Sequence, residues 1–299
     1  MLALRYCAFR FARLVWQHLP ERVGYALASL VGDLTYILWY HGRTRVRENM
    51  ASVLGPGASP RTVERLARES MRNYCKYLAD FLRFPCMSRE EIERRVVFDG
   101  WHNMDLALQG GKGIIFIGLH MGNWDLAAAA ISRRQYPLNV IAESLQPARL
   151  NTFIQGMRAA LGMRVIPVEK GASRFVRALR RNEILGLLID RPSPSNGVAV
   201  RFFDRLTQVP SGAAALALKT GARVLTGGLV RRPDGTFLGV IHHQIPFEPA
   251  GDWQQDVSTL TQQIMSSLET LVRQYPDQWY MFRRMWVQGE GERPVLLAS

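Results

Sequence analysis

Short apolar runs alternate with longer amphipathic segments between residues 95 and 190, and this alternation limits the possible folds more than any other feature. The longer segments carry apolar residues at helical spacing, so they predict helices over 102–111, 123–134, 148–161 and 173–181. Strands that are apolar throughout and separated by helices predict a largely parallel sheet covered on both faces. The predicted strands are RVVFDG (95–100), GIIFIG (113–118), LNVIA (138–142), RVIPV (164–168) and ILGLLID (184–190).

The flanking segments extend this pattern. After the fifth run the sequence predicts a strand over 197–203, a helix over 211–221, a hairpin of 223–232 with 236–245, and a long helix over 253–275. Before the first run, residues 61–85 predict a helical region, and SREE (88–91) predicts a capping box that starts a short helix. The expected fold class is therefore α/β, with a mostly parallel central sheet flanked by helices.

The N-terminal segments predict helices that associate with a membrane. Residues 1–20 place arginines opposite apolar side chains, a pattern typical of helices that lie in a membrane interface. Residues 23–42 are long enough to cross a bilayer, but Asp33 near their middle costs about 2.5–3.5 kcal/mol on insertion scales. We expect helices over 1–60 that lie on a membrane, followed by an α/β domain over 61–299. An ordinary pair of core helices remains an alternative for this region.

The net charge of +13 implies an anionic partner. Nucleic acid, an anionic membrane and phosphorylated or acidic substrates all have the required charge. The sequence lacks the signatures of nucleic-acid-binding folds, so we expect no nucleic acid among the partners. Three widely spaced cysteines form neither a disulfide framework nor a metal-binding pattern, which indicates a reducing compartment.

His120 lies two residues beyond a predicted buried strand, at the sheet edge where reactive groups gather in open α/β folds. Gly122 permits a tight turn, and Asn123 is a suitable N-cap for the next helix. Asp125 then falls in the first helical turn, from which its carboxylate can reach back to the imidazole. A carboxylate that accepts from one ring nitrogen leaves the other nitrogen as a base. The alternative is a capped helix with a histidine hydrogen-bonded for structural reasons.

Two more strand ends add polar groups at the same predicted edge. Asp190 and Arg191 follow the run at 184–190, although such a pair is often only a surface ion pair. Ser211 and Gly212 open a helix whose free N–H groups can hold an anion or a developing oxyanion.

The block from His120 to Asp125 resembles the HxxxxD motif of the glycerolipid acyltransferase superfamily. The whole chain resembles the lipid A biosynthesis (lauroyl/myristoyl) acyltransferases, including phosphatidylinositol mannoside acyltransferases. The segments that carry this resemblance include LPERVGYALASLVGDLTYILW, RVRENMASVLG, GKGIIFIGLHMGNWD, LLIDRPSPSNGVAVRFFD, VPSGAAALALKTGARVL and PDQWYMFRRMW. The resemblance implies transfer of a fatty acyl group from acyl-CoA or an acyl carrier protein to a hydroxyl of a membrane glycolipid. It implies no metal and no cofactor.

The resemblance also implies roles for individual residues. His120 would deprotonate the acceptor hydroxyl, Asp125 would hold His120, and Asp190 would supply a second carboxylate near it. Asp125 and Asp190 could share the task of orienting the imidazole. The residues expected to bind substrate are Asn123, Trp124, Glu143, Arg158, Arg191, Ser211 and Gly212. Related enzymes carry Pro-Glu-Gly where this chain has Pro210-Ser211-Gly212, so a phosphate-binding role for this block stays open.

The expected place of action is the cytoplasmic face of the inner membrane, as a peripheral or monotopic protein whose partners are an anionic lipid, a glycolipid acceptor and the thioester. The oligomeric state stays open. Two other functions fit the residues: a basic membrane- or nucleic-acid-binding protein without catalysis, and a lipid thioesterase or hydrolase that uses water at the same base. The absence of a GxSxG elbow argues against an acyl-enzyme of the α/β-hydrolase type.

Overall fold

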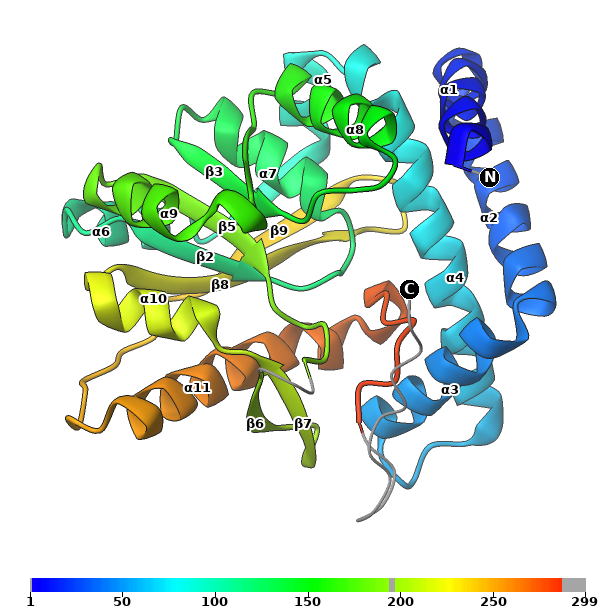
Figure 1. The fold of residues 1–299 in the computed structure, drawn as a ribbon. Coiled ribbons are helices and arrows are strands. Elements are labelled where there is room, and N and C mark those ends of the chain that lie inside the picture. Colours follow the sequence, from blue (N-terminus) through cyan, green and yellow to red (C-terminus); the bar gives the residue numbers. More distant parts are fainter. Residues whose placement is uncertain (1, 194–196, 287–299) are drawn as a thin grey trace.

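A seven-stranded sheet forms the centre of the protein in the computed structural model, which describes residues 2–193 and 197–286 (Figure 1). The strand order is β1-β9-β8-β2-β5-β3-β4, and all neighbours are parallel except β8 and β9. The predicted fold class, α/β with a mostly parallel sheet, is confirmed. The strands are β1 (Val96–Asp99), β2 (Ile114–Gly118), β3 (Leu138–Ala142), β4 (Arg164–Pro167), β5 (Ile184–Leu188), β8 (Arg223–Arg231) and β9 (Phe237–Ile241).

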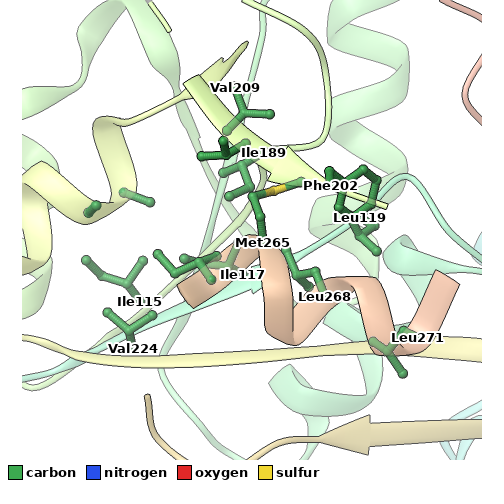
Figure 2. Close-up of a cluster of buried hydrophobic side chains, with 14 of the residues drawn as sticks. Ile115, Ile117, Leu119, Ile189, Phe202, Val209, Val224, Met265, Leu268 and Leu271 are labelled. Atoms are coloured by element: carbon green, nitrogen blue, oxygen red, sulfur yellow. The ribbon is translucent and has the colours of Figure 1, made fainter. Parts of the chain in front are cut away.

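Each face of the sheet packs into its own hydrophobic core. Ile115 and Ile117 of β2 enter one core, while Ile114 and Phe116 enter the other, because successive side chains of a strand point to opposite faces. The first core is closed by α9 (Ala172–Arg180), α10 (Gly212–Thr220) and α11 (Trp253–Gln274), and Figure 2 shows it around Met265. The second core is closed by α6 (Trp101–Gln109), α7 (Trp124–Arg133) and α8 (Ala148–Ala160).

One predicted strand lies outside the seven-stranded sheet. Residues 197–203 form β6 (Gly197–Phe202), which pairs antiparallel with β7 (Arg205–Pro210) in a separate two-stranded sheet. The sequence analysis did not predict β7. The turn between the two strands places Phe203 and Asp204 at positive φ. Val200, Phe202 and Val209 of this hairpin are buried in the first core, beside α11.

Four long helices precede the sheet: α1 (Leu2–His18), α2 (Glu21–Leu38), α3 (Tyr40–Leu54) and α4 (Pro60–Arg83). Helix α4 begins with Ser59, whose hydroxyl accepts from the Thr62 amide at 3.1 Å, followed by a proline in the first turn. The short α5 (Arg89–Arg95) begins in the same way, because Ser88 accepts from the Glu91 amide at 3.1 Å. This N-cap is the one that the SREE pattern predicts.

Helix α2 packs closely against α4 (Figure 1). Its buried positions recur every four residues, at Gly24, Ala28, Gly32 and Tyr36. A Cβ atom on Gly32 would lie 2.6 Å from the Cα of Arg72, so the two backbones could not approach this closely with a larger residue. Asp33 forms ion pairs with Arg68 at 2.7 Å and Arg72 at 2.6 Å. Hydrogen bonds from these arginines hold the pKa of Asp33 well below its usual range.

The opposite face of α2 is apolar and exposed. Its exposed large side chains are Val23, Leu30, Val31, Leu34, Ile37 and Leu38, and Phe11 and Leu14 of α1 are exposed as well. Within residues 2–193 and 197–286, no helix combines the length and apolar character needed to cross a membrane.

Candidate active site

The loop between β2 and α7 carries the predicted base, at the edge of the sheet where the parallel strands end. Gly122 has φ +56°, and a Cβ there would collide with the Leu229 carbonyl oxygen, so the turn requires glycine. The Asn123 side chain accepts from the Leu126 amide at 3.0 Å and caps α7. The sequence analysis correctly predicts this turn and this N-cap.

His120 is paired with Asp190. The imidazole Nδ1 lies 2.7 Å from Asp190 Oδ1, and the backbone N–H of His120 donates to Asp190 Oδ2 at 2.9 Å. A carboxylate can only accept, so Nδ1 carries the proton and Nε2 is the ring nitrogen left to act as a base. The imidazole side chain is 18% exposed, whereas the Asp190 side chain is fully buried.

The charge of Asp190 is stabilised inside the protein. Burial opposes its ionisation, but the imidazole of His120 and hydrogen bonds from His120 and Trp279 outweigh burial and hold the pKa of Asp190 below its usual value. Asp190 is therefore an ionised, fixed acceptor beside the imidazole.

The expected contact between Asp125 and His120 is wrong. Asp125 is buried and accepts from Arg158 Nε at 2.7 Å and from the Tyr77 hydroxyl at 2.8 Å. The first turn of α7 therefore carries this carboxylate toward α8 and α4. The physical reason is that a buried carboxylate needs a counter-charge, which a guanidinium supplies with several donors in a fixed fork. Asp190 alone holds the Nδ1 of His120 among the residues that the structure describes.

Two predicted substrate-binding residues are largely enclosed by the fold. Burial disfavours the charge of Arg158, but Asp125 outweighs it and raises the pKa of the guanidinium above its usual value. Asn123 is buried, and its amide donates to Asp80 Oδ2 at 2.9 Å while its oxygen caps α7. Both side chains therefore support the loop that carries His120.

Other predicted residues lie nearer to solvent. Trp124 is half-buried and meets the His120 ring edge to face, with ring centroids 5.4 Å apart. Glu143 and Arg191 form an exposed ion pair of 3.0 Å, which joins the end of β3 to the residue after Asp190. Ser211 and Gly212 start α10 as predicted, although no hydrogen bond or ion pair within the described residues joins the Ser211 side chain to His120 or Asp190.

The sequence reasoning missed two residues at the site, Tyr77 and Trp279. Tyr77 lies on α4 and Trp279 follows the short helix η3 (Pro276–Gln278), so neither is near the HxxxxD block in the chain. The Trp279 indole N–H donates to Asp190 Oδ2 at 2.9 Å. The signal was present in the segment PDQWYMFRRMW, which carries part of the family resemblance but has no evident chemistry of its own. No group of three or more His, Cys, Asp or Glu in the described residues could hold a metal ion.

The class of protein follows from comparison with known families. The chain matches the family of bacterial lipid A biosynthesis acyltransferases over residues 1–288, and it belongs to this family. It is therefore an acyltransferase, and the alternative of a binding protein without catalysis is set aside.

Two relatives matched by sequence agree with this assignment. A phosphatidylinositol mannoside acyltransferase of Mycobacterium tuberculosis (strain CDC 1551 / Oshkosh) is 30% identical over 261 residues, which cover 84% of this chain and 79% of the relative. Another, from Mycolicibacterium smegmatis, is 27% identical over 252 residues, with 82% and 80% covered. Among solved structures, the 1-acyl-sn-glycerophosphate acyltransferase PlsC of Thermotoga maritima aligns at TM-score 0.36 and 14% identity, over 84% of this chain and 98% of that one.

Proposed function

We propose that this enzyme transfers a fatty acyl group from a thioester, acyl-CoA or acyl carrier protein, to a hydroxyl of a membrane glycolipid, with His120 as the general base. The observation that carries the proposal is the pairing of a partly exposed imidazole with a buried, ionised carboxylate, Asp190. The names of the relatives favour a phosphatidylinositol mannoside-like acceptor, and the family name favours a lipid A precursor.

The chemistry needs only a base and stabilisation of the negative charge that develops. The acceptor O–H gives its proton to Nε2 of His120 while its oxygen bonds to the thioester carbonyl carbon, and the carbonyl oxygen becomes an oxyanion. Collapse of this intermediate breaks the C–S bond, and the imidazolium returns the proton to the departing thiolate. Asp190 keeps Nδ1 protonated and stabilises the imidazolium that forms between the two steps.

The negative charge on the carbonyl oxygen of the intermediate requires hydrogen-bond donors that stabilise it. We assign this role to the backbone N–H groups at the start of α10, at Ser211 and Gly212, which have no acceptor within the helix because they stand at its first turn. Ser211 makes no side-chain cap on this helix, so it does not occupy the donors. Glu143 and Arg191 would contact the acceptor from the rim.

The apolar outer face of α2 supports action on a membrane lipid. One face of α2 is occupied by α4, while large aliphatic side chains such as Leu30 and Ile37 remain 53% and 59% exposed on the other. Contiguous exposed apolar side chains of this kind mark contact with a membrane or a partner. The net charge of +13 adds attraction to anionic lipids, so we place the enzyme on the cytoplasmic face of the inner membrane as a peripheral or monotopic protein.

Basic residues between α9 and α10 offer the donor a cationic surface, which lies at the edge of the sheet where the parallel strands begin, opposite the edge that carries His120. Arg177, Arg180, Arg181 and Lys219 line a shallow hollow of about 580 Å³. No carboxylate pairs with these four cations among the described residues. Phosphates of CoA and the surface of an acidic carrier protein both supply the missing negative charge.

The test is an assay of the purified protein with acyl-CoA or acyl carrier protein and vesicles that contain candidate glycolipids. Mass spectrometry then counts acylated lipid and free fatty acid separately. Acylated lipid that disappears in His120→Ala supports the proposal. Free fatty acid as the main product would instead identify a thioesterase, and full activity in His120→Ala would exclude this base.

A further inference from the structure

The carboxylate beside the base has a third donor. Asp190 is fully buried, and protein groups donate three hydrogen bonds to its oxygens. His120 supplies its ring Nδ1–H to Oδ1 and its backbone N–H to Oδ2, and the Trp279 indole N–H binds Oδ2 at 2.9 Å. Oδ2 is thus held by two donors, which leaves Oδ1 directed at the imidazole.

Trp279 is itself fixed by the fold. It is fully buried, and its ring lies edge to face with Phe202 and Trp286, at centroid distances of 5.8 and 6.2 Å. Its carbonyl oxygen accepts from the Ser70 hydroxyl of α4 at 2.9 Å. The indole N–H therefore has one available direction, toward Asp190.

The chain neighbours of Trp279 form backbone hydrogen bonds to the loop between β2 and α7, which carries His120. The Gly122 amide donates to the Gln278 carbonyl at 2.8 Å, and the Tyr280 amide donates to the His120 carbonyl at 2.8 Å. Residues 278–280 therefore hold both the loop that carries the base and the carboxylate that orients it. Packing alone does not require an indole at position 279, because a phenyl ring would fill most of the same space.

We propose that Trp279 is a positioning residue of the acyl transfer reaction: its indole N–H locks Asp190 so that Oδ1 keeps Nδ1 of His120 protonated and Nε2 aimed at the acceptor. This inference rests on the proposed function for its kinetic readout. The first experiment compares Trp279→Phe with Trp286→Phe. Trp286 belongs to the same aromatic cluster, is buried, and donates its indole N–H to the Phe202 carbonyl at 2.9 Å, away from Asp190.

Both substitutions remove the same atoms and one buried N–H donor. The two donors differ in their acceptor, which is Asp190 for Trp279 and the Phe202 carbonyl for Trp286. We expect Trp279→Phe to lower kcat by about 10- to 100-fold, the loss seen when partners that orient metal-ligating histidines are removed. KM for both substrates should stay unchanged, and Trp286→Phe should keep the kcat of the wild type. Equal losses in the two variants would overturn the proposal.

A double-mutant cycle separates positioning from packing. In an Asp190→Asn background the carboxylate is gone, so Trp279→Phe should lower kcat little further. Independent, multiplicative losses would show that Trp279 does not act through Asp190.

A proton NMR measurement tests the hydrogen bond between His120 and Asp190 without an activity assay. The downfield Nδ1–H signal of His120 should be present in the wild type and Trp286→Phe, and lost or broadened by exchange in Trp279→Phe. An unchanged signal would overturn the proposal even if the enzyme proves to act on another substrate. Should Trp279→Phe fail to fold, the indole N–H signal of Trp279 decides: it must move in Asp190→Asn while that of Trp286 stays in place.

Discussion

Tyr77 of α4 donates its hydroxyl hydrogen to Asp125 Oδ2 at 2.8 Å, and Arg158 of α8 donates to Asp125 Oδ1 at 2.7 Å. Asp125, which follows the proposed base His120 by five positions, therefore joins α4, α7 and α8 beneath the loop. Its connection to the imidazole is indirect, through the helix that this ion pair holds in place.

Asp125→Ala should destabilise the protein. It leaves the guanidinium of Arg158 buried without its counter-charge, a change that costs about 3–5 kcal/mol. Urea unfolding measures this loss. Asp125→Leu combined with Arg158→Met and Tyr77→Phe replaces the polar groups by apolar ones and should recover most of the stability. Wild-type stability in Asp125→Ala together with lost turnover would instead assign Asp125 a direct chemical role.

Asp190→Asn should lower kcat by up to about 10²–10⁴-fold, the usual contribution of a positioned base such as His120, which depends on Asp190 for its tautomer and orientation. The amide cannot stabilise an imidazolium and does not enforce the Nδ1–H tautomer. Single-turnover acyl transfer at saturating thioester measures the loss. Asp234→Asn, which changes a carboxylate in the β8–β9 turn, is the matched control and should keep full activity. A similar loss in both variants would contradict the assignment.

Acid should destabilise the wild type through Asp190. Its pKa is lower in the folded protein than in the unfolded chain, where it is about 3.9. Between these two values the unfolded chain binds more protons, so stability rises with pH there and is lost as pH falls through the folded pKa. Unfolding midpoints in urea between about pH 3 and 6 measure this. Asp190→Asn should flatten the curve below about pH 4, and an unchanged curve would show that Asp190 is not ionised in the fold.

Charge on the outer face of α2 should weaken membrane binding. Ile37→Glu places a carboxylate on an exposed apolar position and should reduce cosedimentation with anionic vesicles, without changing the melting temperature. Val97→Glu is the matched control, because Val97 of β1 is 52% exposed and lies outside α2. Equal vesicle binding by both variants would remove α2 as the contact.

Reversing charge between α9 and α10 should weaken donor binding. Arg177→Glu with Arg180→Glu should raise KM for the thioester while leaving kcat and KM for the glycolipid unchanged. Steady-state kinetics with acyl-CoA and with acyl carrier protein show which donor loses affinity. Arg61→Glu with Arg65→Glu, at two exposed positions near the start of α4, changes the net charge by the same amount and is the control. An equal change in KM there would point to net charge rather than this hollow.

The sequence predicted those parts of the fold that short-range patterns control. Five apolar runs gave the parallel strands, and the Gly122–Asn123 turn gave the start of α7. The strand β7 was missed because RLTQVP (205–210) mixes polar and apolar residues and pairs only with β6.

The hydrogen-bond partner of His120 was harder to predict from the sequence. Asp125 is close to His120 in the chain, whereas Asp190 reaches it through the pairing of β2 with β5, and Trp279 arrives from the C-terminal segment. The spacing of residues in the chain does not encode side-chain direction across a sheet edge. The choice between two carboxylates therefore required the three-dimensional structure.

The close contact at Gly32 has a consequence for how the enzyme meets its acceptor. Helix α2 touches α4 backbone to backbone, and Asp33 is pinned by two arginines, so α2 cannot slide along α4. Tyr77, which also lies on α4, donates its hydroxyl hydrogen to Asp125 in the first turn of α7. On a bilayer, the depth to which α2 sinks would then set the height of His120 above the lipid plane. In the proposed reaction, this height would determine which hydroxyl of the acceptor can reach His120.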